Sequence, residues 1–151
     1  MILLRPAAAV PTPPVPGVVL RPPTVEDTQP LAQLYYDSYD PGIASSTPEE
    51  ALEDITLTFE GGYGVLDPTL SRLAWQADRL VGALLVVERA PWPDTPDCPF
   101  VIELFTARSH RRQGIAKLLL SACSEATVAL RVDPDNKPAV RLYGSFGFQE
   151  G

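Results

Sequence analysis

Prolines set the strongest limits on how this chain can fold. Seven of the first 23 residues are proline, and those between residues 11 and 16 exclude a helix, because proline lacks a backbone N–H and clashes with the preceding turn. Four more prolines lie within residues 91–100 and predict a loop. We therefore expect a proline-rich N-terminal extension at 1–17 that adds little to the core, followed by one folded domain at 18–151.

The segments between the prolines alternate between strand and helix patterns. In chain order we expect a strand at 18–21, helices at 24–39 and 47–60, a hairpin at 71–88 with its turn at 77–79, a strand at 101–107, a helix at 114–126, a strand at 128–132 and a helix at 136–147. Thr24 with Asp27, and Thr47 with Pro48, are typical helix starts. A hairpin combined with two strand-to-helix steps predicts a mixed α+β fold.

Charge is unevenly distributed along the chain. The net charge is −7, but residues 105–120 hold four cations and no acid, so the rest of the chain carries −11. A broadly acidic protein is a poor ligand for nucleic acid, because phosphate binding requires many cations. One basic segment on an acidic protein indicates either a site for a single anionic group or a solvated helix end.

The apolar segments and the cysteines bear on location. The run Leu80–Val87 is too short to span a bilayer, and the N-terminus lacks the basic start of a signal peptide. Cys98 and Cys123 have neither metal-site spacing nor the pattern of a disulfide framework. These features predict a cytoplasmic protein that binds no metal and no membrane.

The basic segment reads HRRQGIA, from His110 to Ala116, and lies between a predicted strand and a predicted helix. The start of a helix leaves backbone N–H groups unpaired, which favours anions. Gly114 would let such an anion approach the backbone closely. Arg111 and Arg112 could add charged hydrogen bonds. The pattern Arg-x-x-Gly-x-Ala is short and arises often by chance.

A second motif lies about twenty residues further along the chain. VDPDNKPAVRLYGSFGF places an asparagine, an alanine, a Leu-Tyr pair and a Gly-Phe pair in the order N-x-x-A-x-x-L-Y-x-x-x-G-F, starting at Asn136. Together with LFTARSHRRQGIA this resembles the GNAT superfamily of N-acetyltransferases over about residues 18–151. The resemblance implies a central, mostly antiparallel sheet flanked by helices, with a V-shaped splay between the fourth and fifth strands.

The resemblance also implies acetyl-CoA as co-substrate and no metal. The pyrophosphate would lie on the loop beginning at Arg111, and the pantetheine arm would follow the strand beginning at Leu104. The cofactor-binding residues implied in this way are Leu104, Phe105, Thr106, Arg111, Arg112, Gln113, Gly114, Ile115, Ala116 and Asn136.

The resemblance places Tyr143 where the family has its general acid. A neutral amine attacks the thioester, a backbone N–H near Phe105 or Thr106 stabilises the oxyanion, and the phenol protonates the departing thiolate. Glu103 is our candidate base, directly or through a water. The alternatives are a core tyrosine at 143, an outward carboxylate at 103 and a purely capping role for Asn136.

Three further expectations concern single aromatic rings. His110 is expected to be an exposed residue without a partner. Trp92 is a candidate for lining a substrate pocket, whereas Trp75 fits better as packing within the hairpin.

The sequence departs from the family pattern after Phe148, where family members add two more strands and this chain ends three residues later. We expect these C-terminal strands to be short or missing. Three alternatives follow: the chain is truncated, the acceptor site is open, or another segment covers the sheet edge left by the missing strands. That segment would be a partner subunit, as in a homodimer, or the N-terminal extension.

The predicted function is therefore transfer of an acetyl group from acetyl-CoA to a primary amine by direct attack in a ternary complex. The acceptor is a small-molecule or peptide amine, whose identity cannot be read from the sequence. The alternative is a non-catalytic acyl-CoA-binding or regulatory module with the same fold.

Overall fold

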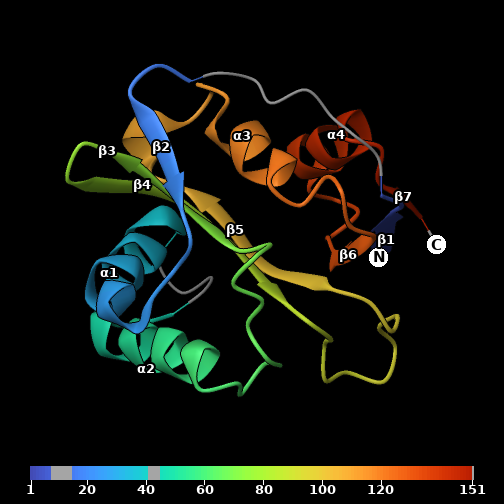
Figure 1. Ribbon diagram of the computed structural model, residues 1–151, viewed down its shortest axis with the longest axis horizontal. Helices are drawn as coiled ribbons and strands as arrows, with labels where there is room; N and C mark the ends of the chain where they lie inside the picture. The colour runs from blue at the N-terminus through green and yellow to red at the C-terminus, as the bar shows by residue number, and fades with distance from the viewer. Residues whose placement is uncertain (8–14, 41–44, 151) are drawn as a thin grey trace.

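The computed structural model describes residues 1–7, 15–40 and 45–150. These residues form a sheet with the strand order β2-β3-β4-β5-β6-β1-β7 and four α-helices, as Figure 1 shows. The strands are β1 (Ile2–Arg5), β2 (Val18–Arg21), β3 (Arg72–Gln76), β4 (Arg79–Val87), β5 (Phe100–Thr106), β6 (Val128–Arg131) and β7 (Gln149–Glu150). The helices are α1 (Thr28–Ser38), α2 (Pro48–Phe59), α3 (Ile115–Ser121) and α4 (Lys137–Ser145). The predicted mixed α+β fold is confirmed.

The predicted helix starts are also confirmed. The backbone N–H of Thr24 donates to Asp27 Oδ2 at 2.9 Å, which closes a capping box around a short 3₁₀ turn ahead of α1. The Glu50 N–H donates to Thr47 Oγ1 at 3.1 Å, with Pro48 in the first turn of α2. In each case a side-chain oxygen satisfies a backbone group that the helix itself cannot.

Helix α3 ends earlier than the sequence pattern predicts. It stops at Ser121, and the chain continues in turns whose N–H groups bond three residues back, as from Ala122 to Leu119. The Arg5 guanidinium donates to the carbonyls of Cys123 and Ser124, at 3.4 and 2.8 Å. These carbonyls lie beyond the end of α3, where no following helical turn donates to them. The side chain of Arg5 donates to them instead.

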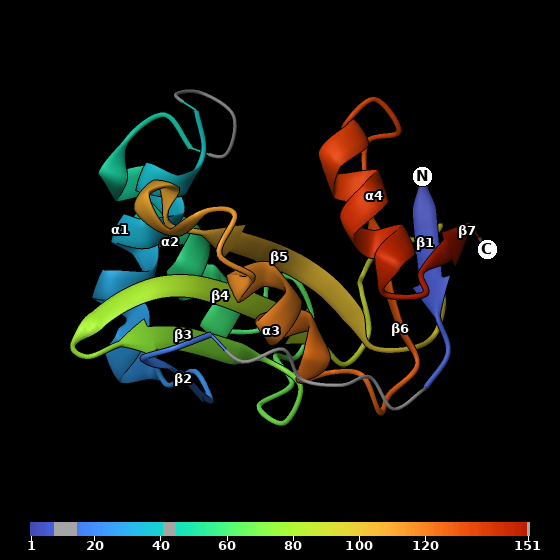
Figure 2. The ribbon, with the colours of Figure 1, turned by 90° about the horizontal axis from the view of Figure 1, so that it is seen from above.

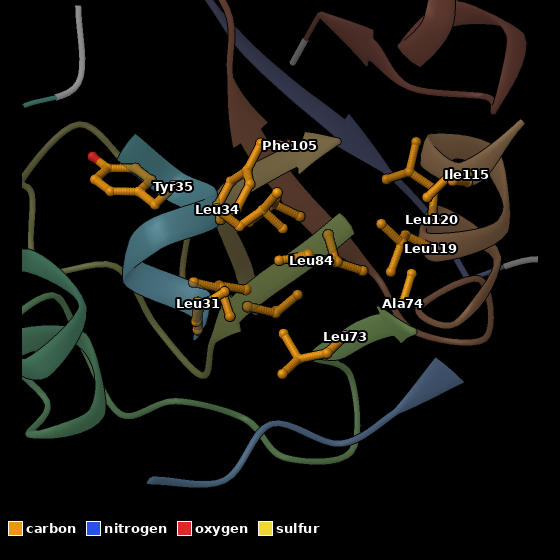
Figure 3. Close-up of a cluster of buried hydrophobic side chains, with 14 of the residues drawn as sticks. Leu31, Leu34, Tyr35, Leu73, Ala74, Leu84, Phe105, Ile115, Leu119 and Leu120 are labelled. Carbon is orange, nitrogen blue, oxygen red and sulfur yellow. The ribbon is translucent and has the colours of Figure 1, made fainter. Parts of the chain in front are cut away.

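The core lies between α1 on one face of the sheet and α3 on the other. Figure 3 shows α1 and α3 side chains on opposite sides of residues from β3 and β4. Gly82 of β4 allows α3 to pack closely, because a Cβ at this position would lie only 2.9 Å from Ile115 Cγ2. No helix in the described part of the chain is long and apolar enough to cross a membrane.

Strands β5 and β6 diverge along their length. They pair in parallel only at Phe100 with Ala129 and Val101 with Leu130, although β5 continues to Thr106. Figure 2 shows the two strands separating, with α4 above β6. This is the predicted V-shaped splay, and it leaves one edge of β5 free of backbone pairing with β6 from residue 102 onward.

A bulge in β5 lies at the start of the splay. Leu85 of β4 opposes Glu103, but Val86 opposes Val101, so Ile102 is an extra residue. An extra residue breaks the alternation of side chains between the two faces of a sheet. The alternation of side chains along β5 is therefore interrupted between Val101 and Glu103.

The N-terminal residues correct our domain prediction. The expectation that residues 1–17 add little to the core is wrong for β1, which pairs antiparallel with β6 from Ile2 opposite Arg131 to Arg5 opposite Val128. Leu3 is buried and Arg5 is only 2% exposed. The prolines begin at position 6, so the first five residues are free to form a strand. Residues 8–14 lie outside the described residues.

The far side of β1 pairs with β7, which has two residues. The expected shortness of the C-terminal strand is thus confirmed. The sequence left open what covers the sheet edge next to β6. In the structure, β1 of the N-terminal extension pairs with this edge.

Candidate active site

A cleft of about 630 Å³ opens along the splay, between the C-terminal half of β5, the loop at 110–117, the end of β6 and α4. It brings together nearly all residues that the sequence assigned to the cofactor. The lining includes Leu104, Phe105, Thr106, Arg111, Arg112, Gly114, Ile115, Ala116, Asn136 and Tyr143. Gln113 is not among the lining residues; its side-chain amide points back to the Ser109 carbonyl, at 3.5 Å.

The loop before α3 has an unusual backbone. Arg112 has φ 63° and Gly114 has φ 86°, both in the left-handed region. Gly114 adopts this conformation without cost, whereas Arg112 adopts it against the preference of a residue with a Cβ. Local strain of this kind is often found where a backbone must present its N–H groups to a ligand.

The cations of this loop have different surroundings. Arg108 donates to the Asp37 carbonyl at 2.9 Å and to Asp40 Oδ1 at 2.8 Å, and Arg111 donates to the Ser38 carbonyl. Two arginines therefore join the loop to the C-terminal end of α1, where a helix leaves carbonyls unpaired. Arg112 is exposed at the mouth of the cleft.

Asn136 caps α4 and also lines the cleft. Its side-chain oxygen accepts from the Ala139 N–H at 3.3 Å. Its side-chain amide nitrogen is a further polar group beside the cleft, so capping alone does not use all of the residue's hydrogen-bonding capacity.

Glu103 borders two cavities that lie next to the cleft. A cavity of about 180 Å³ at the splay is bordered by Glu103 and Tyr143. The residues that it shares with the cleft are Tyr39, Leu104, Arg131 and Tyr143. A third cavity, of about 220 Å³, shares Ile102 and Glu103 with the splay cavity. Glu103 is therefore directed into the site, and not outward.

Tyr39 holds the Glu103 carboxylate in place. Its hydroxyl donates to Glu103 Oε2 at 2.9 Å, and its ring packs against Tyr35 and Phe105. Burial raises the pKa of Glu103 to about 7; the Tyr39 hydrogen bond lowers this pKa and the nearby Asp54 raises it. A carboxylate with a pKa near neutrality can accept and release a proton under ordinary conditions.

Tyr143 faces the splay from α4. Its ring makes an edge contact with Phe148, with the centroids 5.7 Å apart. Burial, and then the charge of Glu103, raise the pKa of Tyr143 to about 12. The phenol is therefore protonated throughout the neutral range and is available as a proton donor.

The third cavity contains residues that the sequence analysis did not assign. Asp54 of α2 accepts a hydrogen bond from the Tyr63 hydroxyl at 2.8 Å. Trp92, considered for a substrate pocket, lines this cavity from the loop between β4 and β5. The complete lining is Tyr35, Asp54, Ile55, Thr58, Tyr63, Trp92, Ile102 and Glu103.

His110 corrects another prediction. Its side chain is buried, with Ser109 Oγ 2.7 Å from Nδ1 and Gln76 Oε1 2.8 Å from Nε2. The expectation of an exposed residue without a partner is wrong. The 3₁₀ turn at Arg108–His110 directs the ring toward the last residue of β3, 34 positions earlier in the chain.

Among residues 1–7, 15–40 and 45–150, no group of three or more histidine, cysteine, aspartate or glutamate side chains is placed to hold a metal ion.

Comparison with known proteins gives matches that cover most of the chain. Three acetyltransferases are among the solved structures that share its fold. An aminoglycoside N-acetyltransferase in complex with CoA is 17% identical, with a TM-score of 0.67 over 88% of both chains. The ribosomal-protein-S18-alanine N-acetyltransferase of Escherichia coli is 16% identical, with a TM-score of 0.66 over 89% of this chain and 79% of that one.

The third is the diaminobutyrate acetyltransferase of Paenibacillus lautus, in complex with its substrate and coenzyme A. It is 25% identical, with a TM-score of 0.58 over 85% of this chain and 74% of that one. No sequence among curated proteins matches the chain. The acetyltransferase (GNAT) family matches residues 29–148, which include β3 to β6 and all four helices apart from the first residue of α1. The chain therefore belongs to the acetyltransferase (GNAT) family.

Proposed function

We propose that this protein transfers an acetyl group from acetyl-CoA to a primary amine by direct attack within a ternary complex. The observation that carries this proposal is the continuity of the three cavities. The cleft shares residues with the splay cavity, and the splay cavity shares Ile102 and Glu103 with the third cavity. Two substrates that enter from opposite sides would meet at the splay, beside Glu103 and Tyr143.

Acetyl-CoA suits the cleft by shape and by hydrogen bonding. The edge of β5 beyond residue 102 has no ladder to β6, so its backbone groups can pair with the amides of a pantetheine arm. The pyrophosphate would lie on the left-handed loop at Arg112–Gly114, with the start of α3 and Arg112 beside it. Asn136 borders the middle of this path. Structural relatives that contain CoA support acetyl-CoA as the co-substrate.

The residues at the splay supply the proton transfers. Glu103, directly or through a water, would take a proton from the acceptor ammonium, and the free amine would attack the thioester carbonyl. A carbon–nitrogen bond forms, the carbon–sulfur bond breaks, and a backbone N–H near Phe105 or Thr106 would stabilise the oxyanion. Tyr143 would give its proton to the departing thiolate, the attacking nitrogen would release its second proton to solvent, and Tyr143 would recover a proton from solvent.

The third cavity favours this function over the alternative of a non-catalytic acyl-CoA-binding module. That alternative rested on the lack of an acceptor pocket. The third cavity, with walls from α2, the turn at residue 63 and the Trp92 loop, would supply one. A cytoplasmic location and a homodimer remain predictions. Because β1 already covers β6, an uncovered β6 edge no longer argues for a second copy.

Thiol release from acetyl-CoA in the presence of primary amines tests the proposed function. We expect release that depends on the amine and saturates with it, together with an acetylated product identified by mass spectrometry. Tight acetyl-CoA binding with no transfer to any member of a broad panel would favour the binding module instead.

The placement of the pyrophosphate predicts the effect of Gly114→Glu. A carboxylate at this position would repel the phosphates, so affinity for acetyl-CoA should fall well over tenfold, about 1.4 kcal/mol or more. Gly114→Ala is the matched control. It bears the same strain of a Cβ in a left-handed backbone, at φ 86°, while that Cβ would meet only Val15 Cγ2 at an ordinary 3.7 Å. Isothermal titration calorimetry measures both; equal affinities for the two variants would contradict the placement.

The contact between Tyr39 and Glu103 predicts a change in pH dependence. Tyr39→Phe removes the hydrogen bond that stabilises the carboxylate, so the pKa of Glu103 rises above about 7. Because the base must be deprotonated, the acidic limb of kcat/KM should move to higher pH. At neutral pH the loss should be roughly three- to tenfold, recovered at alkaline pH.

Tyr36→Phe is the control for this experiment, since Tyr36 lies three residues earlier, in α1, and lines none of the three cavities. A pH profile that is unchanged in Tyr39→Phe would mean that Glu103 does not titrate as the base.

A further inference from the structure

We propose that the third cavity binds a second cationic group of the acceptor, so that the substrate class is a small amine carrying two cations, such as an α,ω-diamine. This inference rests on the proposed function and specifies its acceptor. It depends on the charge, the aromatic walls and the unused hydrogen-bonding capacity of the cavity.

The cavity has carboxylates from two separate elements and no opposing cation. Asp54 comes from α2 and Glu103 from β5, and no lysine, arginine or histidine of the described residues lines the space. The proximity of Asp54 raises the pKa of Glu103, so the two negative charges act on each other. An ammonium group between them would relieve this repulsion.

Each carboxylate retains an oxygen for a ligand. Tyr63 donates to Asp54 Oδ1, and Tyr39 donates to Glu103 Oε2. Within the described ranges, no protein hydrogen bond is made by Asp54 Oδ2 or Glu103 Oε1. Partly buried carboxylate oxygens of this kind favour a charged donor, because such bonds are about twice as strong as neutral ones.

The remaining walls also suit an ammonium group on a short apolar chain. Tyr35, Tyr63 and Trp92 present aromatic rings, which attract cations through their faces, and Ile55 and Ile102 are apolar. A volume of about 220 Å³ matches a small molecule. An anionic acceptor would meet two like charges here.

The two carboxylates have different neighbours, and this separates their roles. Glu103 borders both the splay cavity and the third cavity, so it lies beside the amine that reacts. Asp54 lines only the third cavity among the three. Asp54 would therefore bind the distal cation and select for it, without taking part in the proton transfer.

The test compares amines that differ only in the distal charge. 1,4-Diaminobutane and pentylamine have the same number of heavy atoms, and equivalent pairs with spacers of three to six carbons cover the range of lengths. We expect wild-type kcat/KM for the best diamine to exceed that of its monoamine at least tenfold. Asp54→Asn should lower the diamine value at least tenfold and the monoamine value less than threefold.

Glu53→Gln is the matched control. Glu53 lies beside Asp54 on α2, is exposed and does not line the cavity, so this variant removes the same charge from the surface. Asparagine at 54 retains an oxygen for the Tyr63 hydrogen bond, and a thermal melt checks that the fold is intact.

Three results overturn the inference: a wild type that acetylates monoamines as well as diamines, equal losses for both amines in Asp54→Asn, or the same loss in Glu53→Gln, which would indicate long-range steering. A protein that binds acetyl-CoA and acetylates no amine of any kind contradicts the proposed function itself. Calorimetric binding of 1,4-diaminobutane to the CoA-loaded protein, weakened in Asp54→Asn and unchanged in Glu53→Gln, gives a readout independent of turnover.

Discussion

Deleting residues 1–7 should remove at least about 4 kcal/mol from the free energy of unfolding, since it removes the buried Leu3 and the half-buried Ile2 and Leu4 and exposes the edge of β6. Typical domains have only about 5–15 kcal/mol in total. The truncated protein should therefore be largely unfolded or aggregated near physiological temperature. Urea denaturation followed by circular dichroism measures the change.

The buried Arg5 adds to this effect. Its guanidinium donates to the carbonyls of Cys123 and Ser124, which follow α3, so the deletion leaves these groups to find other partners. The end of α3 and the start of β6 should then loosen together, which hydrogen exchange would detect.

Two point variants distinguish the loss of core packing in β1 from a general sensitivity of edge strands to substitution. Leu3→Ala should cost about 2–4 kcal/mol, because it empties a site in the core. Val19→Ala, on the strand at the opposite edge and more than half exposed, should change stability by less than about 1 kcal/mol. A truncated protein whose stability stays within 1 kcal/mol of the full chain would show that β1 is dispensable in solution.

The second large effect concerns Tyr143→Phe, which should lower turnover at least about a hundredfold while affinity for acetyl-CoA stays within a few-fold. A general acid typically contributes about 10²–10⁴ in rate. The variant loses only the hydroxyl and keeps the ring that packs on Phe148, so the fold and the cleft should survive. The hundredfold loss of turnover is expected when protonation of the thiolate limits the rate.

The protonation state of Tyr143 agrees with this expectation. Because the pKa of Tyr143 is raised to about 12, the phenol stays protonated in the neutral range and carries its proton before the reaction begins. Rapid-quench measurement of the chemical step, with calorimetry of acetyl-CoA binding, separates loss of the acid from loss of the site. If the variant transfers acetyl groups as fast as wild type, Tyr143 is a packing residue, or thiolate departure needs no acid.

Local signals in the sequence were sufficient for the helices and the hairpin. Thr24, Thr47 and Asn136 cap helices through bonds to groups three residues away, and the turn after Gln76 depends on adjacent residues. The two loop motifs also located the cleft, because the strand-to-helix steps that carry them bring Gly114 and Asn136 to the same opening. Such features depend on contacts within a few positions of the chain, and a pattern of residue types records them.

Contacts between distant segments decided the rest. Tyr39 meets Glu103 across 64 positions, His110 meets Gln76 across 34, and Arg5 meets Ser124 across 119. The strand Ile2–Arg5 has no local sign of its partner, because any strand edge offers the same backbone groups, and only the free edge of β6 determines where it pairs. The sequence by itself thus determined the helices, the hairpin and the candidate cofactor loop. Only the tertiary structure decided the sheet order, the partner of Glu103 and the acidic, aromatic cavity, since residue types do not record which distant surfaces pack together.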